Sequence, residues 1–288
     1  MRLKIIGTIL LSLALVVAAI AQDNDAKEKF NEGITAKQTG KLVAAEKAFT
    51  AAIKLHAEYA SAYLELGTVQ FSLKKYTEAL KSFQKVVELE PNNYSAWYNL
   101  GMTQMKTKQY KSSKTSLEKA LKLKPDYLEA QKGMAQLYYT TDQWAKAVET
   151  YEIYTKRNVN DAKAFFFLAK SYKALGELDT AEQTYLKAIK VDSSLAIAHF
   201  NLGNLLRDQE KFNGAVKAYK GAIKADSKMY KAYYNLAVAY QGANTLEEAV
   251  TAYKDFIKRA TGKKHMSGLV RTAKKIVPQI EDHLEQQE

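Results

Sequence analysis

Cysteine is absent from this chain, and proline is scarce, with three residues in 288. The absence of cysteine excludes a disulfide framework, a thiol nucleophile and a cysteine-ligated zinc site. It also excludes the cysteine-borne lipid that exported bacterial lipoproteins carry. Few prolines, 13 glycines and 47% hydrophobic residues are typical of an almost wholly helical protein.

Residue sets that carry catalysis are missing as well. The four histidines lie far apart and in no metal-ligand spacing: His56, His199, His265 and His283. No glycine-rich phosphate loop occurs, because Gly33, Gly67, Gly101 and Gly203 stand singly within predicted helices, where close packing explains them. The serines have no paired base at a recognisable spacing. We therefore predict that the protein is not an enzyme and holds no cofactor or metal.

The first 21 residues have the pattern of a secretory signal peptide. Arg2 and Lys4 supply positive charge, residues 5–20 are nearly all apolar, and residues 19–21 end the stretch with a small-x-small sequence. An uncleaved membrane anchor is the alternative, and both place the rest of the chain outside the cytoplasm. We expect signal cleavage after residue 21, a short linker at 22–25, no membrane span thereafter and a periplasmic location, with secretion as the competing address.

A strict 34-residue period runs from Ala26 to residue 261 without insertion or deletion. If Ala26 is position 1, four positions keep their residue class in every unit. Position 8 is small: Gly33, Gly67, Gly101, Ala135, Ala169, Gly203 and Ala237. Position 20 is Ala or Ser, whereas positions 17 and 24 hold a ring or a leucine, as in Trp144 and Tyr151. Self-similarity at such a period indicates stacked supersecondary units.

Each unit reads as two helices. Positions 4, 7, 8 and 11 share one face of a first helix, and positions 17, 20, 24 and 27 share one face of a second helix. Turn residues such as Gly40 and Gly176 separate the two helices, and Pro91 and Pro125 follow the second helix. The predicted units are 26–59, 60–93, 94–127, 128–161, 162–195, 196–229 and 230–261. Residues 262–288 predict a helix that caps the last unit and is kinked or interrupted near Pro278; a tail that docks a partner is the alternative.

These residues resemble the tetratricopeptide repeat (TPR) family, and an exported bacterial type is expected from the first 21 residues. The resemblance rests on Trp97, Leu100, Gly101, Ala120 and Pro125, together with the Ala, ring and Ala of the other second helices. It implies an all-α, right-handed α-solenoid of seven repeats plus the capping helix. The first unit departs from the family at Lys29 and Glu32, as a terminal unit should. The fourth unit departs at Gln131, which either marks a softer joint or is a half-exposed side chain.

In the proteins that this chain resembles, the first helices line a concave binding surface. Positions 2, 5, 9 and 12 should face it. In the last three units these residues are Lys163, Phe166, Lys170 and Lys173, then Ile197, Phe200, Asn204 and Arg207, then Lys231, Tyr234, Val238 and Gln241. Rings beside cations and amides suit an extended peptide, since rings accept apolar side chains and cations meet acids.

Position 6 repeats an asparagine at Asn31, Asn99, Asn201 and Asn235. The resemblance implies that such an asparagine holds a peptide's backbone or its terminal carboxylate. Lys170, Asn201 and Lys231 follow the succession of the family's carboxylate clamp, but Phe166 and Asn235 stand where a lysine and an arginine belong, so the clamp is partial. A role of these asparagines in helix packing is the alternative.

The formal net charge of +12 favours an acidic partner. Only five of the 43 basic residues are arginine, which disfavours nucleic acid, because bidentate base readout uses arginine. We predict a noncatalytic adaptor that binds a peptide or partner protein of acidic character. The alternatives are a lysine-rich binder of acidic envelope polymers or anionic membrane surfaces, and an enzyme-related role. The partner's identity, the pathway, the organism and homo-oligomerisation stay open.

Overall fold

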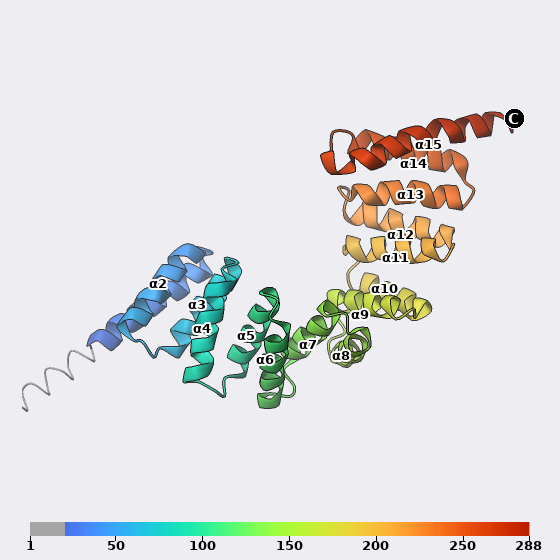
Figure 1. Ribbon diagram of the computed structural model, residues 1–288. Helices are drawn as coiled ribbons and strands as arrows, with labels where there is room; N and C mark the ends of the chain where they lie inside the picture. Colours follow the sequence, from blue (N-terminus) through green and yellow to red (C-terminus); the bar gives the residue numbers. More distant parts are fainter. Residues whose placement is uncertain (1–20, 288) are drawn as a thin grey trace, which may run out of the picture. The chain divides into compact units, whose positions relative to one another are not determined.

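The computed structural model describes residues 21–287, and these residues are almost entirely helical (Figure 1). The expected signal peptide therefore lies, except for Ala21, outside the described residues. Within residues 21–287, no helix combines the length and the apolar character that crossing a bilayer requires.

The predicted all-α fold of paired helices is confirmed. A helix at residues 21–38 comes first. It is followed by α2 (Leu42–Leu55), α3 (Ala60–Ser72), α4 (Tyr76–Leu89), α5 (Tyr94–Lys106), α6 (Tyr110–Leu123), α7 (Leu128–Thr140), α8 (Trp144–Arg157), α9 (Ala162–Ala174), α10 (Leu178–Val191), α11 (Ala196–Asp208), α12 (Phe212–Ala225), α13 (Tyr230–Gly242) and α14 (Leu246–Ala260). A short 3-10 helix, η1 (Lys264–Met266), and α15 (Ser267–Glu285) complete the chain. From α3 onward, the first helices of successive pairs begin 34 residues apart, as the period requires.

The chain divides into two compact units, and the division falls inside α7. Unit 1 ends at Leu137 and unit 2 begins at Tyr138. In each unit, helices that follow one another in the sequence pack side by side, as α11, α12, α13 and α14 do in unit 2. Each unit is thus a stack of helix pairs, which is the solenoid arrangement.

Position 8 must be small because the large side chain at position 24 packs directly against it. A Cβ atom added to Gly67 would stand 2.7 Å from the ring of Phe83, and one added to Gly203 would stand 2.6 Å from the ring of Tyr219. The position-24 side chains are at most 1% exposed: Phe49, Phe83, Leu117, Tyr151, Tyr185, Tyr219 and Tyr253. Burying a side chain of this size stabilises the fold by about 1.5–3 kcal/mol, so this contact is a principal source of stability in every unit.

The turn between the two helices places position 15 in the left-handed region in all seven units. Gly40 and Gly176 have φ of 73° and 82°, and five other units carry a residue with a side chain there: Lys74, Lys108, Asp142, Glu210 and Asn244, with φ between 56° and 62°. A left-handed residue closes the first helix and reverses the chain. The glycines recognised in the sequence therefore mark a backbone position that the other units occupy at a conformational cost.

Gln131 stands where the preceding unit has the ring of Trp97, and it makes the equivalent hydrogen bond. Trp97 Nε1 donates to the Pro91 carbonyl at 2.8 Å, and Gln131 Nε2 donates to the Pro125 carbonyl at 2.9 Å, one repeat later. His199 Nε2 lies 3.1 Å from the Ser193 carbonyl at the same repeat position. The half-buried Gln131 thus ties the loop between two pairs to the helix that follows it.

Two terminal segments differ from expectation. Residues 22–25, expected as a linker, belong to the helix at 21–38, because Gln22 Nε2 donates to the Leu55 carbonyl at 2.9 Å and Asp23 lies 3.0 Å from His56 Nδ1. Of the kink or interruption expected near Pro278, the interruption does not occur, because α15 is continuous from Ser267 to Glu285. Pro278 and Lys274 lie on the exposed side of α15, so water can satisfy the Lys274 carbonyl that loses its donor. Helix α15 packs on α14, as expected of a cap.

The turn geometry yields the first prediction. Gly176→Ala should destabilise the protein by about 1 kcal/mol, because alanine resists a positive φ, while nothing within 4 Å of an added Cβ would be disturbed. Glu210→Gly, at the same position of the next unit, should stabilise by about 0.5–1 kcal/mol. Urea-unfolding midpoints measure both changes. Equal signs for the two substitutions would contradict the assignment.

Candidate functional site

Eleven of the twelve predicted binding residues lie on α9, α11 and α13 of unit 2. We call the side of these three helices that carries these residues the first-helix face. It carries Lys163, Phe166, Lys170 and Lys173 on α9, Phe200, Asn201, Asn204 and Arg207 on α11, and Lys231, Tyr234 and Asn235 on α13. Asn99 lies on α5 in unit 1 and is half-buried.

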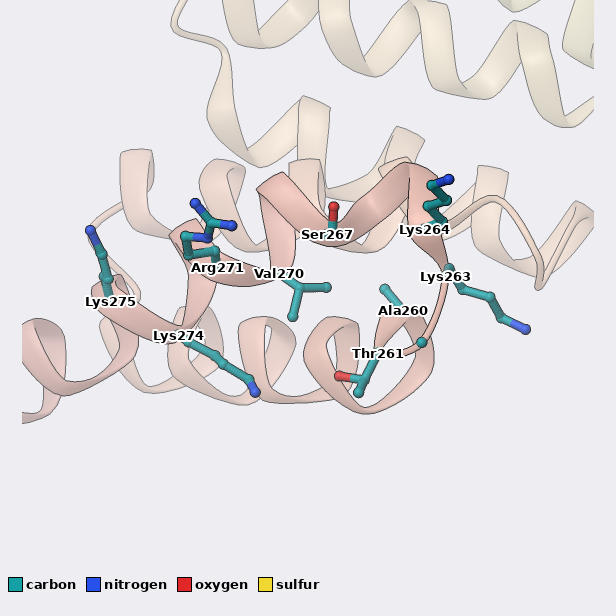
Figure 2. Close-up of a pocket in the computed structure, with 10 residues that line it drawn as sticks. Ala260, Thr261, Lys263, Lys264, Ser267, Val270, Arg271, Lys274 and Lys275 are labelled. Carbon is teal, nitrogen blue, oxygen red and sulfur yellow. The ribbon is translucent and has the colours of Figure 1, made fainter.

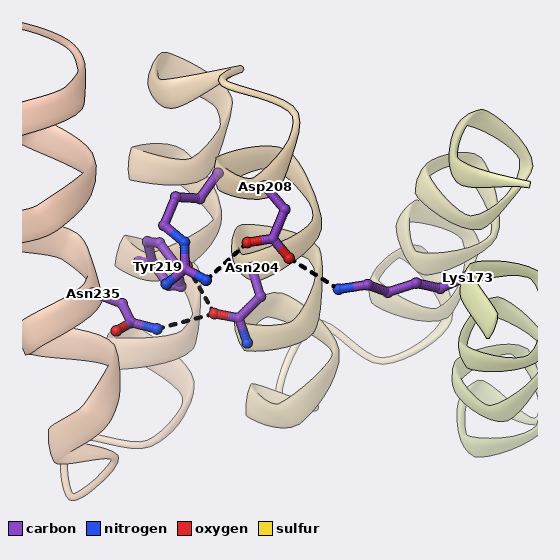
Figure 3. A network of polar contacts seen from close by, with 6 residues as sticks. Lys173, Asn204, Asp208, Tyr219 and Asn235 are labelled. Atoms are coloured by element: carbon purple, nitrogen blue, oxygen red, sulfur yellow. Dashed lines mark hydrogen bonds and ion pairs between the residues drawn. The ribbon is translucent and has the colours of Figure 1, made fainter. Parts of the chain in front are cut away.

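Two predicted cations meet a carboxylate that the prediction did not include. Lys173 Nζ lies 3.2 Å from Asp208 Oδ2, and an Arg207 guanidinium nitrogen lies 2.8 Å from Asp208 Oδ1 (Figure 3). Burial raises the pKa of Asp208, but hydrogen bonds from Arg207 and Lys173 outweigh it and hold the pKa below its ordinary value of 3.8. Asp208 therefore remains ionised at neutral pH, and its share of stability is lost only as the pH falls through that lowered pKa. Part of the positive charge expected on this face is thus compensated within the protein.

Two side-chain donors, one from α12 and one from α13, converge on the amide oxygen of Asn204 on α11. Tyr219 Oη donates to Asn204 Oδ1 at 2.8 Å, and Asn235 Nδ2 donates to the same oxygen at 2.9 Å (Figure 3). Burial raises the pKa of Tyr219 to about 12, so its hydroxyl stays a donor at neutral pH. Two donors fix the Asn204 amide with its oxygen toward α12 and α13.

This arrangement leaves amide groups for a ligand. Among the described residues, Asn204 Nδ2 and Asn235 Oδ1 have no hydrogen-bond partner, and both side chains are half-buried. An amide nitrogen donates and an amide oxygen accepts, as the backbone of an extended peptide requires. The pair can therefore bind one carbonyl and one N–H of such a peptide.

The rings of the first-helix face differ in what they offer. Phe200 and Tyr234 are half-buried; the Phe200 ring centroid lies 5.9 Å from Tyr219, and that of Tyr234 lies 5.4 Å from Phe256. Phe166 is only 7% exposed, because it packs on Phe167 and Tyr185. Phe166 thus offers little surface to a ligand, and its departure from the family's lysine is explained by packing.

The remaining predicted residues also differ in which groups their side chains contact. Asn201 Nδ2 donates to the Ile197 carbonyl of its own helix at 2.8 Å, so this nitrogen is already engaged within α11. Lys170 Nζ lies 5.1 Å from the ring centroid of Tyr139 and 5.8 Å from that of Phe166. Lys163 and Lys231 are exposed and form no ion pair with a described carboxylate.

Asp208 and Tyr219 are the functional candidates that the sequence did not reveal as such. Tyr219 reads as a packing residue because position 24 is large in every unit. Asp208 follows Arg207 directly and stands 35 residues after Lys173, so a lysine at position 12 facing an acid at position 13 of the next unit was the available signal. Within residues 21–287, no three His, Asp or Glu side chains gather to hold a metal ion.

The chain belongs to the tetratricopeptide repeat family. A tetratricopeptide repeat model matches residues 30–94 and 200–263, a second matches residues 94–127, and a TPR repeat model matches residues 169–206. These matches fall on the helix pairs described above. No curated protein gives a significant match to the chain.

Solved structures with the same fold are similar at low sequence identity. YrrB, described as a TPR protein with an unusual peptide-binding site, is 24% identical, with a TM-score of 0.53 over 65% of this chain and 96% of YrrB. PilF of Pseudomonas aeruginosa is 17% identical, with a TM-score of 0.61 over 78% of this chain and 99% of its own. A tetratricopeptide repeat protein of Parabacteroides merdae is also 17% identical, with a TM-score of 0.64 over 87% and 99%. At these identities the likeness shows the fold alone.

The buried tyrosine hydroxyls yield the second prediction. Tyr219 Oη has Asn204 as a partner, whereas the hydroxyl of Tyr185, at the same position one unit earlier, is buried without one. Tyr219→Phe should therefore cost about 1 kcal/mol of unfolding free energy. Tyr185→Phe should be neutral or stabilising, because it removes an unsatisfied buried group. Urea unfolding measures both, and a larger loss for Tyr185→Phe than for Tyr219→Phe would contradict the described network.

Proposed function

We propose that the protein is a noncatalytic adaptor that binds an extended peptide segment of a partner protein on the first-helix face of unit 2. The observation that carries the proposal is the amide pair of Asn204 and Asn235. Tyr219 and Asn235 both hydrogen-bond Asn204 Oδ1, so the amide is already oriented before a ligand arrives. A binding group that is fixed in advance loses less entropy on binding.

The surroundings of the amide pair favour a peptide with both apolar and acidic side chains. Phe200 and Tyr234 flank it with half-buried rings, which accept apolar side chains. Lys231 is exposed without a carboxylate partner on this face, and Lys163 is exposed as well, which favours an acidic segment. YrrB supports the proposal to the extent that it is described as a TPR protein with a peptide-binding site.

The proposed address is outside the bacterial cytoplasm, most simply the periplasm. It rests on the charged start and apolar stretch of residues 1–21. N-terminal sequencing of the protein from its source cell tests this part, since a mature chain that begins at Gln22 supports export, and a chain that retains Met1 in the cytosolic fraction contradicts it.

Removing the flanking rings tests the assignment of the first-helix face. Phe200→Ala combined with Tyr234→Ala should abolish capture of the partner from an envelope extract, because the peptide loses its apolar contacts. The matched control is Leu186→Ala with Val191→Ala, which removes exposed apolar side chains from the second helix α10. Circular dichroism verifies that both variants are folded. Unchanged capture by the ring variant, or equal loss in the control, would reject the assignment.

Asp208 tests the acidic character of the partner. Asp208→Asn leaves Lys173 and Arg207 without their carboxylate, so an acidic peptide should bind about threefold more tightly, in line with the modest strength of exposed charge interactions. Titration calorimetry at low salt measures the change, and the gain should shrink in 0.5 M salt, as screening requires (about 4 Å Debye length). Weaker binding by Asp208→Asn would contradict an acidic partner.

A further inference from the structure

A cavity of about 500 Å³ opens where α14 turns into α15 (Figure 2). Its base is apolar, with Ala260 at the end of α14 facing Val270 in the first turn of α15. The turn between them contains Gly262, whose φ of 83° reverses the chain sharply. The cavity is therefore built by the fold of the hairpin itself.

Cations dominate the cavity lining. Five of its ten residues are basic, and none is acidic: Lys263, Lys264, Arg271, Lys274 and Lys275 line it together with Ala260, Thr261, Gly262, Ser267 and Val270. The hydroxyl of Ser267 has no hydrogen bond to another described residue, so it can serve as a neutral donor. Such a lining offers donors and positive charge around an apolar base.

The charge of this cavity is uncompensated, whereas two other cations of the hairpin are paired. Elsewhere on α14 and α15, Lys254 pairs with Glu281 at 2.6 Å and Arg259 pairs with Asp255 at 2.8 Å. The five lining cations form no ion pair with any carboxylate of residues 21–287; Lys263 Nζ lies over the ring of Tyr230 at 5.9 Å. Figure 2 shows the five charged side chains spread around the rim of the cavity, so together they give this end of the hairpin a positive potential that attracts an anion.

We propose that this cavity binds a phosphate group. A phosphate monoester carries nearly two negative charges at neutral pH and three acceptor oxygens, so a positive rim attracts it more strongly than it attracts a carboxylate. The apolar base formed by Ala260 and Val270 receives the part of the ligand next to the phosphate. A soluble phosphate ester and a phospholipid headgroup share this chemistry. The cavity shares no residue with the first-helix face, so it is a second site.

Phosphate titration of the intact chain tests the proposal. Inorganic pyrophosphate, added at constant ionic strength and followed by amide NMR shifts, should bind saturably with its largest shifts at residues 261–275. Arg271→Gln combined with Lys274→Gln should weaken binding about tenfold, because two charged donors are lost. The matched control, Lys217→Gln with Lys224→Gln, removes the same charge from exposed positions of α12 and should leave the affinity unchanged.

Two further experiments distinguish a lipid headgroup from a soluble phosphate ester, and a phosphate from a carboxylate ligand. The protein is sedimented with phosphatidylglycerol vesicles and, for comparison, with phosphatidylcholine vesicles. Binding to phosphatidylglycerol that depends on Arg271 and Lys274 indicates a lipid headgroup. Binding of pyrophosphate alone indicates a soluble ester. Hexaglutamate that binds as tightly through the same residues would overturn the phosphate assignment in favour of a carboxylate. Equal losses in the α12 control, or the absence of saturable pyrophosphate binding, would also overturn it. None of these variants alters the first-helix face, so failure here is distinct from failure of the peptide proposal.

Discussion

The contact between a small residue at position 8 and a large buried side chain at position 24 is the constraint on which the structure depends. It sets how closely the two helices of a pair approach, since a Cβ on Gly203 would stand 2.6 Å from the Tyr219 ring. Because each pair buries its core only against itself and its neighbours, stability accumulates locally along the stack. A 34-residue sequence rule is therefore enough to build every pair.

The same rule connects the core to the first-helix face. Tyr219 fills the core with its ring and reaches Asn204 on the exposed side with its hydroxyl. Tyr253 does likewise, donating to Gln241 Oε1 at 3.1 Å. The hydroxyls of Tyr151 and Tyr185 have no partner, although their positions in the repeat are the same. In the last two repeat units, where Asn204 and Gln241 accept these hydrogen bonds, the core tyrosine thus orients a surface amide.

Helix positions could be predicted from the sequence more fully than side-chain pairing. The starts of α3, α5, α7, α9, α11 and α13 follow from the period, because a helix pair repeated without insertion keeps its register. The ion pairs of Lys173 and Arg207 with Asp208 could not be predicted, because they depend on the rotamers of side chains from different helix pairs. The sequence alone also left open whether Pro278 kinks or interrupts its helix; α15 is continuous because packing of Val277 and Ile280 on the last repeat outweighs the one hydrogen bond that proline removes.

Two surfaces of unit 2 thus have different chemistry. The first-helix face combines oriented amides and half-buried rings with cations that are partly compensated by Asp208. The hairpin cavity combines five uncompensated cations with an apolar base. The first has the chemistry of the proposed peptide site and the second that of the proposed phosphate site, and the two share no residue.

Site-specific photocrosslinking in the source cell tests the central claim most directly. A photoreactive amino acid at Lys231, on the first-helix face, is compared with the same amino acid at Lys224, on the exposed side of α12. The account predicts one discrete crosslinked partner from position 231, attached through an extended segment, and none from position 224. Equal crosslinking from both positions, or crosslinking from position 224 alone, would contradict it.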